Sequence, residues 1–243
     1  AAGEEGEEGD QGTGAEEGRP KPNEVCLGFS RDGFHFSRPD RRAFLPISES
    51  RGDWNWGNVS SAGGGCLVVG DRLYFYCSGR SGQQGTPTEG CHTGLAFLRR
   101  DGFASMRAGA EVGTLTTRPV TFTGGHLFVN ADVAGGELRV EVLAEDGAAI
   151  EGLTREECVP VTADSTIAPV RWESTDDLSH LAGTPVRFRF TLRGGDLYAF
   201  WVSPDASGAS RGYVAAGGPG FETNRDTVGA AAYDAAAAVS EGE

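Results

Sequence analysis

The chain has 243 residues, of which 38% are hydrophobic, and its formal net charge at pH 7 is -14. Half of that charge comes from acidic residues that precede the first basic residue, Arg19. An acidic chain disfavours nucleic acid and anionic membranes as partners. No apolar run approaches the ~20 residues that cross a bilayer, so we expect no membrane span. The N-terminus also lacks the basic and apolar regions of a signal peptide.

Residues 1–23 are rich in Gly and Glu and have almost no apolar side chains. Such a segment buries too little surface to offset the entropy of ordering the chain. We predict that it is a disordered, acidic segment.

Residues 24–109 form short apolar runs separated by turns, which is typical of β-structure. A strand followed by Arg-Asp-Gly-Phe occurs twice, with Asp32 and Asp101 at matching positions. Asp-Gly tolerates the positive φ angles of tight hairpins. A second hairpin is predicted from residues 66–69 to 73–77, followed by a loop over 78–89 and a returning strand over 93–99. The repeated phrase favours a partial β-propeller, with the Asp101 turn at the outer edge of a four-stranded blade.

The loop over residues 52–65 combines two tryptophans with two amides, two hydroxyls and several glycines. Sugars stack their C–H faces on indole rings and bond amides through their hydroxyls. The candidate substrate-binding residues are Trp54, Trp56, Asn58 and Arg80, the last of which follows the strand over 73–77. The alternative is that the tryptophans cover a core edge and that Arg80 is a solvated rim residue.

Other reactive side chains carry weaker signals. The five cysteines form no Cys-x-x-Cys pair and have no His at a metal-ligand interval, so we predict neither a metal site nor a cofactor. Cys66 and Cys77 flank the predicted hairpin, which leaves a disulfide as a minor alternative. Cys91 and His92 are adjacent in the sequence, but adjacency alone does not orient the imidazole of His92 as a base toward the thiol of Cys91.

Residues 110–205 predict a β-sandwich. Apolar and charged residues alternate over 137–142 and 186–192, and turns follow at Asp146-Gly147 and Gly194-Gly195. Further strands are expected over 121–130, 170–172 and 196–201, with at most one helical turn over 176–181. Arg187, Arg189 and Arg193 suggest either an anion-binding strip or a solvated outer face. Residues 206–243 form a Gly/Ala-rich tail that we expect to be loosely packed, although 230–239 favour helix.

Three phrases carry a resemblance to a known family: residues 30–39 (SRDGFHFSRP), 54–59 (WNWGNV) and 73–76 (LYFY). They resemble the last blades of five-bladed β-propeller proteins related to glycoside hydrolase families 32 and 43. The part from 113–119 to 198–202 resembles the β-sandwich that follows such propellers. The resemblance covers about three quarters of the chain and implies an all-β fold.

The resemblance also implies hydrolysis of glycosidic bonds by carboxylates that project into the propeller funnel, mainly from earlier blades. The family 32 pattern places an essential Asp in Arg-Asp-Pro, whereas here Arg31-Asp32 and Arg100-Asp101 are each followed by Gly and are interpreted as outer turns. Glu157-Cys158 matches the Glu-Cys phrase of the acid catalyst but falls inside the predicted sandwich, so it is rejected. The catalytic residues are left unknown.

The sequence therefore predicts the C-terminal portion of a glycoside-hydrolase-like protein that acts on or binds oligo- or polysaccharides, with its catalytic carboxylates upstream. A glycan-active parent is compatible with the extracellular space or the periplasm. One alternative is a non-catalytic carbohydrate-binding protein in which Tyr198 or Phe200 of the sandwich is exposed. Another is a scaffold without a sugar ligand.

Overall fold

The computed structural model describes residues 21–61, 65–82, 85–86 and 89–240. It is mostly β, with 42% strand, several antiparallel sheets and one short helix, so the predicted all-β class is confirmed. The predicted disorder of 1–23 falls almost wholly outside the described residues. The chain forms two compact units, which we call the first unit (1–64 and 76–96) and the second unit (65–75 and 97–243). Within the described ranges, no helix is long and apolar enough to cross a membrane.

The first unit contains two short strands that pair with each other, β1 (Val25–Cys26) and β2 (Ala43–Leu45). Between them, Phe29 and Ser37 exchange backbone hydrogen bonds of 2.9 Å. Asp32 accepts bonds from the amides of Phe34 and His35 at this turn. The Asp-Gly hairpin predicted here is therefore present.

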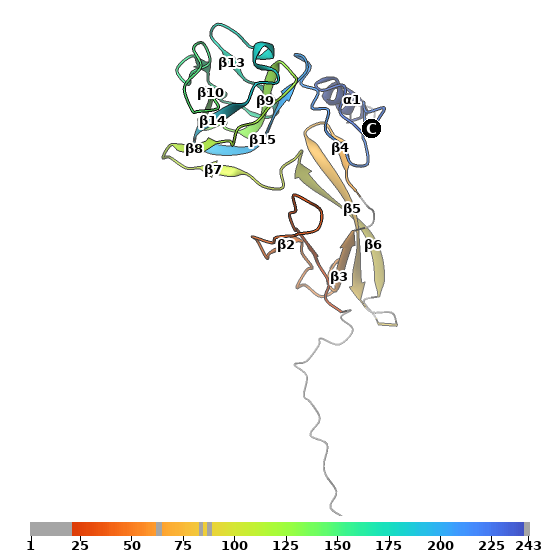
Figure 1. The fold of residues 1–243 in the computed structure, drawn as a ribbon. Helices are drawn as coiled ribbons and strands as arrows, with labels where there is room; N and C mark the ends of the chain where they lie inside the picture. The colour runs from red at the N-terminus through yellow and green to blue at the C-terminus, as the bar shows by residue number, and fades with distance from the viewer. Residues whose placement is uncertain (1–20, 62–64, 83–84, 87–88, 241–243) are drawn as a thin grey trace, which may run out of the picture. The chain divides into compact units, whose positions relative to one another are not determined.

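The rest of the first unit is built on β3 (Asn58–Ser61) and on residues 76–96 of two long strands, β5 (Arg72–Gly82) and β6 (Gly90–Arg99). β3 and β6 both pair with β5 (Figure 1). The prediction of loops over 52–65 and 78–89 is wrong for the residues that form β3 and the end of β5. Glycine and serine have weak strand propensity. Here the pairing of β3 with residues 77–80 holds these residues extended.

The predicted hairpin at residues 66–77 is confirmed in the second unit. β4 (Leu67–Val69) pairs antiparallel with residues 72–74 of β5, and Gly70 supplies a φ of 56° at the turn. The strand that follows the Asp101 turn does not add to this hairpin. Instead, β7 (Met106–Ala108) pairs with β15 (Gly195–Ser203).

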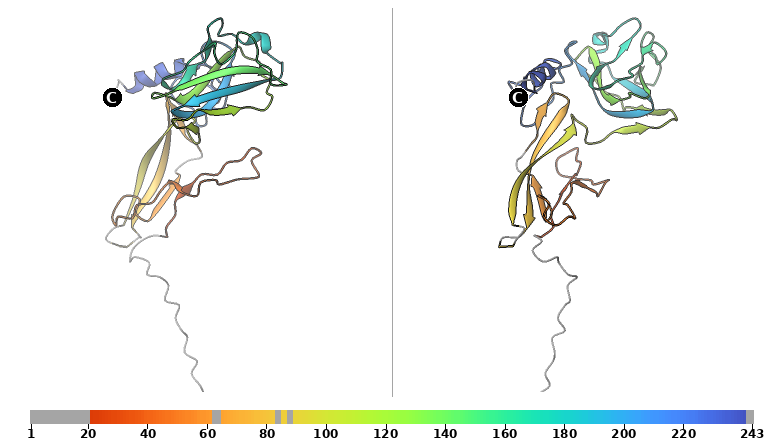
Figure 2. Two further views of the ribbon diagram at one scale, coloured as in Figure 1. Left: turned by 90° about the vertical axis from the view of Figure 1, so that its left-hand side faces the viewer. Right: turned by 180° about the vertical axis from the view of Figure 1, so that it is seen from behind.

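Two larger antiparallel sheets of the second unit share one hydrophobic core. One sheet has the order β10 (Glu137–Ala144), β14 (Val186–Arg193), β8 (Gly113–Thr116). The other has the order β12 (Asp164–Pro169), β9 (His126–Asp132), β15, β7. A short pair, β11 (Cys158–Val159) and β13 (Arg171–Trp172), contributes Cys158 and Trp172 to the same core. The strands from β7 to β15 run from yellow-green to blue in Figure 2.

Alternation explains the packing of this core. Val140 and Phe190 are paired across β10 and β14 and are both buried, while their charged neighbours lie on the outer face. Trp172 is buried as well and donates from Nε1 to the carbonyl of Val140 at 3.1 Å. The predicted strands over 137–142, 186–192 and 196–201 are confirmed, and the predicted helical turn is the 3-10 turn Ser179–Leu181.

The expectation of a loosely packed tail is wrong. Val214 is buried with Val68 and Leu73 of the β4–β5 hairpin. The helix α1 (Ala231–Ser240) lies beside β4 and buries Ala232 and Ala236 (Figure 1, Figure 2). Small side chains let a helix approach the strand closely, so this packing needs no stripe of large apolar residues and leaves no amphipathic signature.

Candidate functional site

The tryptophan loop of the first unit is a tightly bonded turn. The amide of Trp56 donates to the carbonyl of Asp53 at 3.0 Å, and Asn55 donates from Nδ2 to the carbonyl of Pro46 at 3.0 Å. Ser48 donates from its hydroxyl to the carboxylate of Asp53 at 2.5 Å. These bonds fix the direction in which each indole leaves the loop.

Trp54 lies on the sheet face formed by two glycines of neighbouring strands, Gly79 of β5 and Gly94 of β6. A Cβ atom on Gly94 would lie 2.5 Å from Cη2 of Trp54 and 3.1 Å from the sulfur of Cys77, and a Cβ on Gly79 would also collide with the indole. The glycines are thus needed for the close approach of the ring. Trp54 remains 39% exposed, which makes its outer side a fixed aromatic surface.

Trp56 has the opposite environment. It is fully buried, and the guanidinium of Arg51 lies 5.6 Å from the centre of its ring. A ring with no exposed surface cannot stack on a ligand, so the structure gives Trp56 the core role that was the alternative interpretation. Sequence alone does not separate the two tryptophans, because both sit between small and polar residues.

Asn58 and Arg80 are directly opposite each other in the β3–β5 ladder. Paired residues project from the same sheet face, and successive residues of a strand project from opposite faces. Arg80 therefore leaves β5 on the face opposite to the one on which Gly79 meets Trp54. The four predicted substrate-binding residues are not brought together: Trp54 is on one face, Asn58 and Arg80 are on the other, and Trp56 is in the core.

A polar pair borders the Trp54 surface, and the sequence singled out only one of its members, His92. Ser81 of β5 and His92 of β6 are joined by a 3.0 Å hydrogen bond between Oγ and Nε2. Ser81 is two residues from Gly79, and His92 is two residues from Gly94. Because side chains alternate along a strand, both project from the face that carries the indole. Ser81 is buried and His92 is exposed. Only the spacing Gly79-x-Ser81 and His92-x-Gly94 could have indicated this pair, and it becomes informative only once the strands are known.

The carboxylates considered from the sequence have local roles. The amide and ring of His35, the amide of Phe34 and the hydroxyl of Ser30 donate to Asp32 and hold its pKa well below its usual range. The hydroxyl and amide of Thr154 donate to Glu157 and lower its pKa. Groups with lowered pKa values are poor proton donors at neutral pH. Neither residue is suited to act as a general acid.

The cysteines and potential metal ligands add no further centre in the part of the chain that the structure describes. All five cysteine thiols are free, with Cys26 and Cys91 exposed and the other three buried. Within the described part of the chain, no group of three or more His, Cys, Asp or Glu side chains is arranged to hold a metal ion.

Two aromatic residues of the second unit, Tyr198 and Phe200, are only partly exposed. Phe200 packs against the core, with its ring centre 4.9 Å from that of Phe190. Arg99 lies over the ring of Tyr198 at 4.8 Å. Both rings are less exposed than the carbohydrate-binding alternative expects, and that alternative stays a prediction.

No protein-family model, no curated protein and no solved structure matches this chain.

Proposed function

We propose that the protein binds glycans through Trp54 and that it is the C-terminal portion of a glycoside-hydrolase-like protein. The observation that carries the proposal is the position of Trp54: one side of its indole lies on Gly79 and Gly94, and the other is exposed. Sugar rings stack on such surfaces because their C–H faces are apolar. A ring that is already held in place loses little conformational freedom on binding.

The neighbouring Ser81–His92 pair supports this assignment. The buried hydroxyl of Ser81 holds the exposed imidazole of His92, which presents a ring nitrogen to a sugar hydroxyl at the edge of the aromatic surface. Pockets that bind small ligands commonly combine an apolar surface with a few polar groups that fix orientation. The pair is therefore placed to select one orientation of a sugar stacked on Trp54.

The finer architecture belongs to the same proposal. The β3–β5–β6 sheet with its β4 hairpin corresponds to part of a propeller blade, and the two sheets of the second unit correspond to the β-sandwich of the resembling glycoside hydrolases. In that arrangement the catalytic carboxylates come from blades upstream of this chain. The carbohydrate is the partner, and no cofactor takes part.

The proposal is tested by isothermal titration of the full chain with a panel of neutral oligosaccharides. Trp54→Ala removes the stacking surface and is expected to weaken binding of the best ligand by roughly two- to tenfold, since stacked aromatic contacts contribute about 0.5–1.5 kcal/mol. Phe34→Ala is the matched control, because Phe34 is 86% exposed and belongs to the same unit. Circular dichroism checks that both variants fold. Unchanged affinity in Trp54→Ala, or equal losses in both variants, contradicts the proposal.

A further inference from the structure

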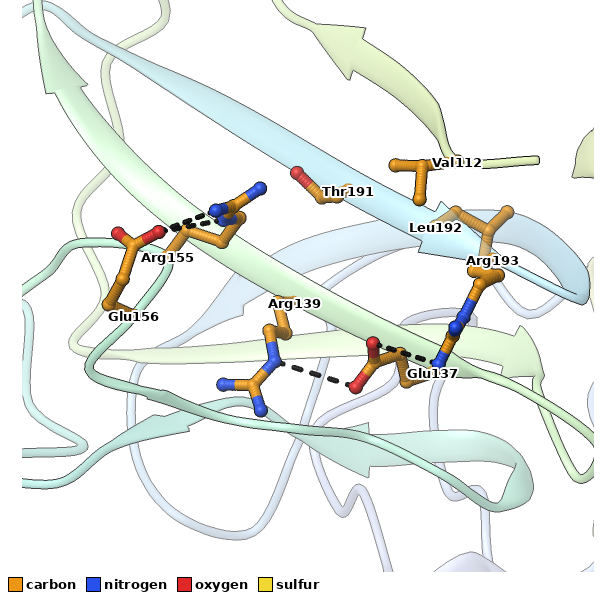
Figure 3. A pocket seen from close by; sticks show the side chains of 8 residues that line it. All are labelled: Val112, Glu137, Arg139, Arg155, Glu156, Thr191, Leu192 and Arg193. Carbon is orange, nitrogen blue, oxygen red and sulfur yellow. Dashed lines mark hydrogen bonds and ion pairs between the residues drawn. The ribbon is translucent and has the colours of Figure 1, made fainter.

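The outer face of the β10–β14 sheet carries a pocket of about 410 Å³ that the proposed function does not use. Figure 3 shows its lining, in which Arg155 pairs with Glu156 and Glu137 lies between Arg139 and Arg193. The lining residues are Val112, Glu137, Arg139, Arg155, Glu156, Thr191, Leu192 and Arg193.

The charges in this pocket do not cancel. Glu137 is shared between two guanidiniums, at 3.5 Å from Arg139 and 3.4 Å from Arg193. Among the described residues, Arg155 has only the neighbouring Glu156 as an ion-pair partner, at 2.6 Å. Three arginines thus face two glutamates. The pocket is a locally positive place in a chain whose net charge is -14.

Each arginine also retains unused hydrogen-bonding capacity. Arg155 directs Nε and Nη2 to the same carboxylate oxygen of Glu156, and Arg139 donates from Nη1 to the carbonyl of Cys158 at 2.6 Å. Within the described ranges, Nη1 of Arg155, Nη2 of Arg139, Nη1 of Arg193 and the hydroxyl of Thr191 have no partner. Four donors therefore line one pocket without an acceptor.

We infer that this pocket binds the carboxylate or sulfate group of an acidic sugar. A guanidinium presents parallel N–H groups that match the oxygens of such anions. Val112, which is 59% exposed, adds an apolar side chain to the lining, which suits the C–H surface of a sugar ring better than a bare inorganic ion. The sugar part of this inference rests on the proposed glycan function, whereas the anion part depends only on the arginines.

The experiment is a ¹H–¹⁵N NMR titration of the full chain at constant ionic strength, observing the arginine Nε–Hε resonances. The ligands are an oligogalacturonate, its methyl ester and sodium sulfate. Because the ester keeps the sugar and removes the charge, it isolates the contribution of the carboxylate. We expect the oligogalacturonate to shift the resonances of Arg139, Arg155 and Arg193, and the ester to leave them in place.

Variants locate the site. Arg155→Gln is expected to weaken oligogalacturonate binding about tenfold, the effect of one lost charged hydrogen bond. Arg118→Gln is the matched control, because it removes the same charge from an exposed arginine of the second unit outside the pocket. Equal binding of acid and ester, equal losses in both variants, or no shift of the three arginines overturns the inference.

Two further outcomes separate this inference from the proposed function. Trp54→Ala is expected to leave the arginine shifts unchanged, so loss of neutral-sugar binding alone does not affect the pocket. If sodium sulfate shifts the three arginines and the oligogalacturonate does not, the acidic-sugar assignment is overturned.

Discussion

The indole of Trp54 occupies the space in which a side chain at Gly94 would stand, since a Cβ there would lie 2.5 Å from Cη2 of the ring. We therefore predict that Gly94→Ala displaces the indole and lowers the free energy of unfolding by about 1–3 kcal/mol, the usual cost of overpacking. Urea denaturation followed by circular dichroism measures the change. Gly109→Ala is the control, because a Cβ at Gly109 meets no atom within 4 Å. Equal stability of the two variants would contradict the packing described.

The two loop tryptophans should differ in their access to solvent. Trp54 is 39% exposed and Trp56 is fully buried. The fraction of tryptophan fluorescence that iodide quenches should therefore fall most in Trp54→Phe. In Trp56→Phe this fraction should not fall. Trp172 is 3% exposed and should contribute little to the quenched fraction in any variant. A quenched fraction that falls in Trp56→Phe instead would show that the loop packs differently.

A buried ion pair joins Asp226 of the C-terminal segment to Arg100, which follows β6. The atoms Nη2 of Arg100 and Oδ2 of Asp226 are 3.1 Å apart. Removing one partner of such a pair leaves the other charge buried, which typically costs about 3–5 kcal/mol. We expect a loss of this size in the unfolding free energy of Asp226→Asn. Asp40→Asn breaks the exposed pair with Arg42 and should leave the urea midpoint unchanged. Similar urea midpoints for the two variants would mean that this ion pair does not stabilise the packing of the C-terminal segment.

Asp226 also predicts how stability depends on pH. Burial alone would raise its pKa, but bonds from the amides of Gly229 and Ser210 and the charge of Arg100 outweigh burial and lower it. A carboxyl with a lowered pKa in the folded state stabilises the fold above its unfolded value of about 3.9, and this contribution is lost as the pH falls through the folded pKa. Denaturation at a series of pH values from pH 7 down to about pH 2 should show this acid loss in the wild type. The curve of Asp226→Asn should be lower and flatter in the acid range, and parallel curves would contradict the assignment.

Thiol reactivity should follow burial. Cys26 and Cys91 are exposed, whereas burial raises the pKa of the Cys66, Cys77 and Cys158 thiols and keeps them protonated. Because the thiolate is the reactive form, iodoacetamide at neutral pH should label Cys26 and Cys91 in the native protein and the other three only in urea. Peptide mass mapping after short exposure identifies the labelled sites. Early labelling of Cys158 would contradict the burial of the β10–β13 region.

Much of the fold could be read from local pattern. The alternation around Val140 and Phe190 identified both strands, and Gly70-Asp71 identified the β4–β5 turn, because a strand with one buried face must repeat every second residue. The short strand β8 and the strand β12 carry no such pattern and were missed. Their conformation comes from pairing with β14 and β9 rather than from their own residues.

The candidate site, like the fold, is only partly predictable from the sequence. Sequence alone selected the tryptophan loop, because indoles among glycines are unusual outside a binding surface or a core edge. Only the tertiary structure separated exposed Trp54 from buried Trp56 and put Arg80 on the opposite sheet face. The physical reason is that composition is a property of a segment, whereas the direction of each side chain is set by the strand register. That register depends on partners far away in the chain.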